Sequence, residues 1–272
     1  MDDFVFSFFK ADSISALTGH GMIHKIQELY ASIVHNWLPG DQILLFGFSR
    51  GAFIARMIGA LIGDVGILHP TEMDGFCDLF KAYQVLGVNG ADDGAKQQAN
   101  KILSLYRKGG SKATRVIPEG TLKCIGVWDT VCALGMPRYG EGDSHPSYLG
   151  FSDDMLGNHI QFCFHALAID EHRGDFLPTK WGQNPEQRRA GQVLKQVWFP
   201  GSHSDVGGGY AEHELSDIAL MWMVANVIEN KLLAIDTQFV LSIPAPLYGW
   251  GKMASHNDGT SDGEMKVFGS DR

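Results

Sequence analysis

Two kinds of hydrophobic pattern follow one another in the first fifty residues. Between Met22 and Trp37, apolar residues recur every three or four positions, which predicts a helix with one apolar face. Pro39 and Gly40 end that pattern. Gln42 to Gly47 is then a short, continuous apolar run between turn signals, which is typical of a strand buried on both faces.

The same strand pattern returns twice, and helical patterns lie between its occurrences. Leu122 to Trp128 and Gln192 to Phe199 are the other apolar runs that predict strands. Helical spacing begins at Ser49 and returns over Leu215 to Ile228. Strands that alternate with helices indicate a three-layer α/β fold with a mostly parallel sheet, in which functional sites gather beyond the carboxyl ends of the strands.

The length of 272 residues predicts a single domain over 1–272, because one hydrophobic core serves chains of up to roughly 250–300 residues. Polar-rich helical segments near Thr71–Val85 and Ala95–Tyr106 predict a helical insertion or cap over 71–120. The segment 251–272 is polar and glycine-rich, so we expect a frayed tail there.

The strongest chemical signal is Gly47-Phe48-Ser49-Arg50-Gly51, which fits the G-x-S-x-G pattern between a predicted strand and a predicted helix. Small residues allow a sharp turn that projects the Ser49 hydroxyl above the sheet, and the backbone N–H of Arg50 can stabilise an oxyanion. We therefore predict a nucleophilic Ser49 in an elbow formed with Gly47, Arg50 and Gly51. The alternative is a serine that only caps the helix, with glycines for close packing.

A serine nucleophile needs a base, and His203 is the leading candidate among eleven histidines. It follows a predicted strand, lies in a glycine-rich loop, and comes last in the chain order of serine, acid and histidine. His165 and His172 flank an apolar-then-charged segment and stay open as alternative bases, or as core and salt-bridging groups.

For the acid, Asp129 is the natural candidate, because it ends a predicted strand and a buried carboxylate can orient an imidazole. Asp170 and Asp205 compete with it. Asp205, two residues after His203, more naturally organises the loop by binding backbone N–H groups, and we assign Asp205, Gly207 and Gly208 to the support of the base.

Two other readings of the His203 region are weaker. His203 with Asp205 forms a possible metal pair, but no third ligand stands at a clear spacing. Gly207 to Gly209 suggests a phosphate cradle, yet the lysine of a P-loop and the spacing of a dinucleotide site are absent. The sequence therefore predicts chemistry without a metal or another cofactor.

Charge and cysteine content narrow the partners. The net charge is −9, with 31 acidic against 22 basic residues and no long basic run, so nucleic acid is not expected as a partner. Four cysteines without C-x-x-C spacing suggest reduced thiols and a cytoplasmic location. Met1 to Lys10 lacks the basic region of a signal peptide, and no apolar stretch reaches about 20 residues, so any membrane contact is expected to be peripheral.

Four blocks of sequence together resemble one known family. They are GFSRGAFIAR at 47–56, IGVWDTVCALG at 125–135, HALAIDEHR at 165–173 and WFPGSHSDVGGGY at 198–210. In this order they are similar to the uncharacterised α/β-hydrolase domain of many fungal proteins and of bacterial type VI secretion phospholipase effectors of the Tle type.

The resemblance implies an α/β-hydrolase fold with a triad that maps onto Ser49, Asp129 and His203, and phospholipid ester hydrolysis in the bacterial members. Members of the family usually begin with a strand that ends in an Asp-Gly-Thr-like turn. This chain begins with Met1-Asp2-Asp3, so its first strand is expected to be missing.

The function expected from the sequence is therefore a serine hydrolase that cleaves carboxylic esters, lipid or phospholipid esters among them, through an acyl-enzyme. The expected partner is a small acyl-ester or lipid substrate. The alternative is a catalytically silent, truncated remnant of the fold, or a binding module, that keeps the triad residues.

Overall fold

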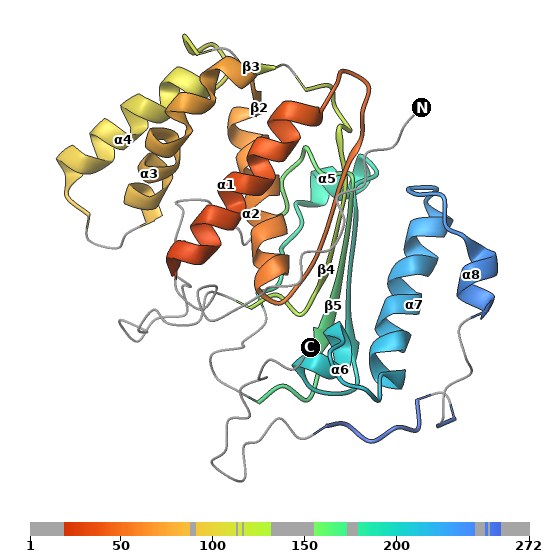
Figure 1. Ribbon diagram of the computed structural model, residues 1–272. Coiled ribbons are helices and arrows are strands. Elements are labelled where there is room, and N and C mark those ends of the chain that lie inside the picture. The colour runs from red at the N-terminus through yellow and green to blue at the C-terminus, as the bar shows by residue number, and fades with distance from the viewer. Residues whose placement is uncertain are drawn as a thin grey trace.

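The computed structural model has a parallel β-sheet at its centre, with helices on both faces (Figure 1). The structure describes residues 19–87, 91–112, 114–115, 117–131, 155–172, 179–242, 248–249 and 251–256. The three-layer α/β architecture predicted from the alternation of strands and helices is confirmed in this part of the chain.

The sheet has four parallel strands in the order β1-β4-β5-β6. Their bounds are β1 (Ile43–Phe48), β4 (Leu122–Trp128), β5 (Phe162–Ala168) and β6 (Val193–Phe199). Phe48 pairs with Trp128, and Trp128 pairs with Ala166, so these strands end at nearly the same level. Because all four run in one direction, the residues that follow them meet at one edge of the sheet.

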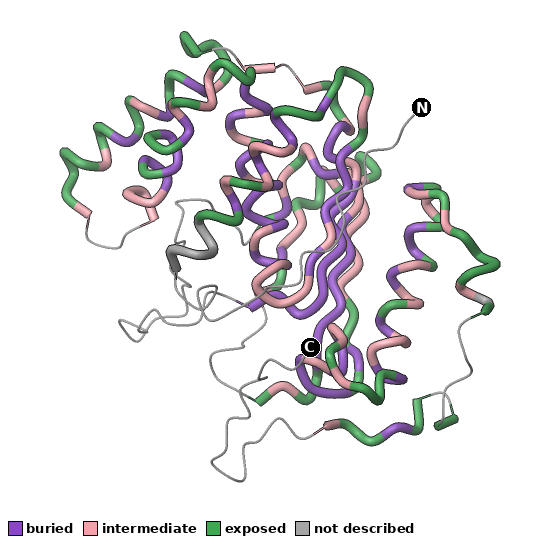
Figure 2. The backbone as a smooth tube through the Cα atoms, in the orientation of Figure 1, coloured by how far each residue is buried: buried purple, intermediate pink, exposed green. Residues whose placement is uncertain are grey.

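Helices α1 (Gly19–Asn36) and α2 (Arg50–Val65) cover one face of the sheet, and α7 (Glu214–Glu229) covers the other. Side chains alternate between the faces, as a strand requires. Ile125 joins the larger core with α1 and α2, whereas its neighbour Cys124 joins the smaller core under α7. Figure 2 shows the buried strands between these helix layers.

The segment after α2 forms a helical layer beyond α1. Its elements are β2 (Ile67–Leu68), the short helix η2 (Pro70–Gly75), α3 (Phe76–Gly87), α4 (Asp93–Tyr106) and β3 (Thr114–Arg115). β2 and β3 pair antiparallel, and buried side chains of α3 and α4 belong to the larger core. The helices expected within 71–120 are present, and their role as an insertion or cap stays a prediction.

The remaining helices are α5 (Pro185–Arg189), α6 (His203–Gly207) and α8 (Thr237–Ser242). Two elements differ from the sequence expectation. The segment Phe162–Ala168 is a strand although His165 interrupts its apolar run, and His203 begins a short helix where a loop was expected. The helix forms because its N-terminus is capped by Ser202 and Asp205, which the glycines that follow obscure in the sequence.

Both chain ends were the subject of predictions. The expectation that a first strand is missing falls on residues 1–18, which lie outside the described part of the chain. In the described part, β1 forms one edge of the sheet. Of the predicted frayed tail, 257–272 also lie outside it, while 251–256 are described. Among the helices the structure describes, none combines the length and apolar character needed to cross a bilayer.

Candidate active site

Ser49 occupies the sharp turn between β1 and α2. Its backbone angles, φ 59° and ψ −122°, are unfavourable for a residue with a side chain, and such strain concentrates at functional sites. The Ser49 N–H donates to the carbonyl oxygen of Trp128 at 3.0 Å, which fixes the turn to the end of β4. The Ser49 side chain makes no capping hydrogen bond to α2, so it does not act as the helix cap considered above.

The two glycines of the elbow play different parts. A Cβ on Gly47 would lie 2.3 Å from the backbone oxygen of Gly51, so no side chain fits at position 47. A Cβ on Gly51 would have no neighbour within 4 Å. Of the two glycines, Gly47 alone stands where the surrounding backbone leaves no room for a side chain.

Arg50 is the first residue of α2, which places its backbone N–H at the positive end of the helix dipole. Its side-chain nitrogen Nη1 is buried and has no hydrogen-bond partner in the part of the chain the structure describes. Buried donors are normally paired, so the Nη1 group of Arg50 can still donate a hydrogen bond to an anionic group.

Asp129 follows the last residue of β4 and is 1% exposed. Its backbone has a positive φ of 37°, and its N–H donates to the carbonyl oxygen of Ala166 at 2.7 Å. The carboxylate oxygen Oδ1 accepts from the N–H of Ala168 at 3.0 Å. The second oxygen, Oδ2, lies 2.6 Å from Nδ1 of His203, so the acid is held on one side by backbone and on the other by the imidazole.

His203 begins α6 and is 6% exposed. Its Nε2 lies 2.7 Å from the Ser49 hydroxyl oxygen, and its ring packs against that of Phe48 with centroids 4.5 Å apart. With Nδ1–H donated to Asp129, Nε2 accepts the hydrogen bond of the Ser49 hydroxyl, and this is the tautomer a general base requires. The structure therefore joins Ser49, His203 and Asp129 in one continuous hydrogen-bonded chain.

The alternative bases lie elsewhere. His165 is fully buried in the middle of β5, where its Nε2 accepts from the N–H of Thr130 at 3.4 Å. Burial, reinforced by the positive charge of Arg56, lowers the pKa of His165 to about 3, so this imidazole is neutral. His172 is exposed after β5. His165 thus holds the backbone directly after Asp129, because it binds the N–H of Thr130.

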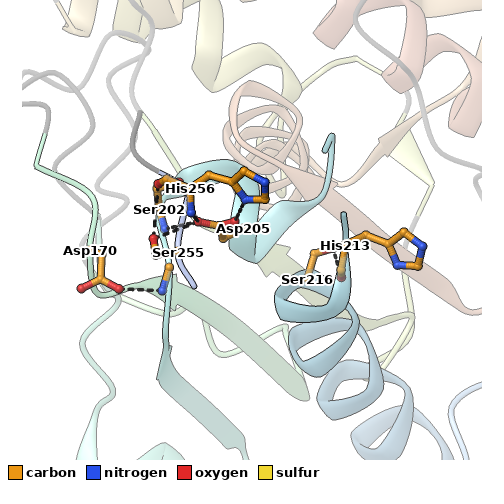
Figure 3. Close-up of polar contacts among 8 residues, drawn as sticks. Asp170, Ser202, Asp205, His213, Ser216, Ser255 and His256 are labelled. Atoms are coloured by element: carbon orange, nitrogen blue, oxygen red, sulfur yellow. Dashed lines mark hydrogen bonds and ion pairs between the residues drawn. The ribbon is translucent and has the colours of Figure 1, made fainter. Parts of the chain in front are cut away.

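The alternative acids have other partners. Asp170 accepts the N–H of Gly201 at 2.7 Å and so holds the turn that leads from β6 to α6. Asp205 accepts the N–H and hydroxyl of Ser202, at 2.9 and 3.0 Å, and also binds Ser255 and His256 (Figure 3). Both carboxylates therefore brace the backbone around the base.

The glycines assigned to the support of the base have two physical roles. A Cβ on Gly207 would lie 2.0 Å from Cε2 of Phe48, so the absent side chain makes room for that ring. Gly208 has a φ of 86° and Gly209 one of 136°, and both values favour glycine. The cluster is a backbone bend packed on Phe48, and the phosphate cradle considered above gains no support from it.

Metal chemistry at this loop also lacks a ligand set. In the described ranges, no group of three or more histidine, cysteine, aspartate or glutamate side chains gathers as metal ligands do. The potential pair is already divided, because His203 faces Asp129 and Asp205 faces His256.

The sequence assigned no role at this site to Phe48 or His256, and it left His165 open as a base or a core group. Phe48 and His165 lie in predicted or overlooked core segments, and aromatic or histidine residues there give no sign of what they touch. His256 lies in the segment expected to fray, and its partner Asp205 is 51 residues away, so no local pattern marks the contact.

Comparison with known proteins gives three matches. The family model described as "T6SS, Phospholipase effector Tle1-like, catalytic domain" matches residues 5–226. Uncharacterized protein YEL023C of Saccharomyces cerevisiae (strain ATCC 204508 / S288c) is 26% identical over 163 residues, which are 60% of this chain and 22% of that protein.

The third match is a solved structure, that of the Tle1 effector bound to the VgrG spike from the Type 6 secretion system. It superposes with a TM-score of 0.35 and 20% identity, covering 71% of this chain and 31% of the effector chain. This chain thus corresponds to less than a third of the length of either relative.

Proposed function

The chain belongs to the Tle1-like catalytic-domain family of type VI secretion phospholipase effectors, and we propose that it is a serine hydrolase that cleaves carboxylic esters of lipids, phospholipids included. The observation that carries the proposal is the hydrogen-bonded chain from the Ser49 hydroxyl through His203 to Asp129, with heavy-atom distances of 2.7 and 2.6 Å. Nucleophile, base and orienting acid at such distances are the arrangement that acyl transfer requires.

In the proposed reaction, Ser49 Oγ attacks the ester carbonyl carbon while His203 Nε2 takes the hydroxyl proton. The tetrahedral intermediate collapses, the bond to the leaving alcohol breaks, and His203 returns the proton to that alcohol. Water then attacks the acyl-enzyme by the same route, releasing the acid and restoring the Ser49 hydroxyl. Asp129 stabilises the imidazolium that forms in each half-reaction.

Stabilisation of the oxyanion is assigned to the backbone N–H of Arg50. It stands at the first position of α2, directly after the nucleophile, and the strained turn at Ser49 aims this end of the helix at the site edge of the sheet. The unused Nη1 donor of Arg50 supports a substrate that carries an anionic group, as a phospholipid does.

The substrate is reached, in this proposal, by peripheral contact with a lipid surface. The described helices include none suited to span a membrane, and the chemistry above needs no cofactor. A cytoplasmic location stays an expectation from the cysteine pattern.

A serine-directed fluorophosphonate probe tests the proposal, because it reacts with activated serines. We expect labelling at Ser49, located by peptide mass spectrometry, and none in Ser49→Ala. Ester turnover in that variant should fall by on the order of 10⁴-fold or more, measured with a short-chain aryl ester and phospholipid vesicles.

Ser104→Ala is the matched control, because Ser104 lies on the exposed side of α4 and should label as the parent protein does. Circular dichroism of each variant separates lost activity from lost structure. Unchanged turnover in Ser49→Ala would remove the serine-hydrolase proposal. A folded parent protein that neither labels nor turns over any ester would favour the silent remnant.

A further inference from the structure

We propose that Ser255 and His256 are positioning residues for the base: they hold Asp205 and thereby fix α6, the helix that begins with His203. The inference rests on the proposed serine-hydrolase function and extends it to a segment of the chain that no sequence motif assigns to the site. It makes the stretch around residues 251–256 part of the machinery that aims the imidazole.

The first ground is the number of contacts on one carboxylate. Oδ2 of Asp205 accepts the Ser255 hydroxyl and the His256 N–H, both at 3.0 Å, and Oδ1 lies 2.6 Å from Nδ1 of His256. Its other two partners among the described residues are the N–H and hydroxyl of Ser202. More than half of the contacts on Asp205 therefore come from a segment about 50 residues further along the chain. Figure 3 shows them converging on this side chain.

Burial makes those contacts matter. Asp205 is 2% exposed, and a charged carboxylate taken out of water must be compensated by donors. Burial alone would raise its pKa, but hydrogen bonds from His256, Ser202 and Ser255 outweigh it and lower the pKa. The charge on Asp205 is thus maintained by Ser255 and His256 together with its own loop.

His256 also contacts Tyr210, the residue that follows the three glycines at 207–209. Its ring stacks on that of Tyr210, with centroids 3.8 Å apart and an interplanar angle of 17°. Asp205 precedes the three glycines at 207–209 and Tyr210 follows them, so one imidazole contacts residues on both sides of this glycine stretch. Fixing both ends limits how far α6 can rotate, and with it the direction of His203.

Two variants separate the two contacts of His256. His256→Asn keeps a side-chain donor near the position of Nδ1 and loses the stacked ring, whereas His256→Phe keeps the ring and loses the donor. His213→Phe is the matched control, because His213 also pairs with an aspartate through Nδ1, at 2.8 Å from Asp217, but does so on an exposed surface at the start of α7.

With a short-chain aryl ester, we expect His256→Phe to lower kcat by about 10- to 100-fold and to change KM by less than about twofold. His256→Asn should recover most of the lost kcat, since the donor to Asp205 matters more than the stack. His213→Phe should match the parent protein. A parent-like kcat in His256→Phe, or equal losses in both His256 variants that follow only their loss of stability, would overturn the proposal.

A second measurement keeps this test separate from that of the proposed function. The proton between His203 Nδ1 and Asp129, whose heavy atoms lie 2.6 Å apart, should give a low-field proton resonance that is absent in Asp129→Asn. Its detection needs no turnover. The resonance should shift or broaden in His256→Phe and stay unchanged in His213→Phe. If the parent protein neither labels nor hydrolyses esters, the proposed function fails, while an unperturbed resonance in His256→Phe would by itself reject the positioning role.

Discussion

The proposed nucleophile, Ser49, and the proposed base, His203, are held in place by different means. Ser49 is fixed within a few residues by backbone geometry: a strained turn, a glycine with no room for a side chain, and one hydrogen bond to the neighbouring strand. His203 is bound by the side chain of Asp129, and the neighbouring residues Gly201 and Asp205 are bound by Asp170 and His256, all from distant segments. A local turn can be specified by a short motif, whereas a base held by distant polar groups depends on the whole fold.

The largest expected effect comes from changing the hydrogen bond between Asp129 and His203. Asp129→Asn should lower kcat by on the order of 10⁴-fold, because the amide favours the wrong imidazole tautomer. Asp170→Asn should cost far less, because the amide oxygen can still accept the Gly201 N–H. Steady-state kinetics of both variants measure the contrast. Similar losses in the two would mean that the acid has been misassigned.

The pH dependence of stability tests whether His165, which binds Thr130 beside Asp129, is neutral in the folded protein. His165 has a folded pKa near 3, lowered from 6.5 mainly by burial, so between these values the unfolded chain binds a proton that the folded chain does not. Stability is therefore lost as pH falls through this window, with a slope approaching about 1.4 kcal/mol per pH unit.

Urea unfolding of the parent protein and of His165→Phe at a series of pH values measures this slope. The difference in unfolding free energy between them should shrink or change sign as pH falls from 6.5 toward 3. A difference that stays constant over the window would mean that His165 is not held neutral in the folded protein.

Within the nucleophile turn, Gly47→Ala should destabilise the fold by about 1–3 kcal/mol or more, because the new methyl would overlap the backbone at Gly51. The Gly47→Ala variant should also lose labelling of Ser49, because the turn must open to make room for the new methyl group. Thermal unfolding and probe labelling measure the two effects, and a variant that kept both properties would show that the turn is less rigid than its geometry implies.

The smallest effect is expected at the other glycine of the same motif. Gly51→Ala meets no neighbour and lies in the first turn of α2, so it should stabilise the fold by about 0.5–1 kcal/mol and leave turnover intact. The same two measurements apply. A loss of labelling in Gly51→Ala would assign position 51 a role that its open surroundings do not indicate.

This division also explains how much the sequence predicted. The strand at Leu122–Trp128 matches its prediction, and the helices after Ser49 and near Leu215 were found, because each buries a regular apolar pattern. Ser49, Asp129 and His203, which the structure joins by hydrogen bonds, could be named together because each follows such a strand. β5 was missed since a neutral histidine in its centre resembles a polar break, and His256 was missed because its contact depends on tertiary folding alone.

The close fit between Phe48 and Gly207 has an evolutionary consequence. The ring of Phe48 fills the space that a side chain at 207 would need, and it also packs against the imidazole ring of His203. A side chain at 207 therefore fits only if residue 48 is smaller, and a smaller residue 48 removes the ring that packs against the imidazole of His203. The two positions should therefore change together or not at all, which links the strand that ends at the nucleophile to the helix that begins at the base across descent as well as in space.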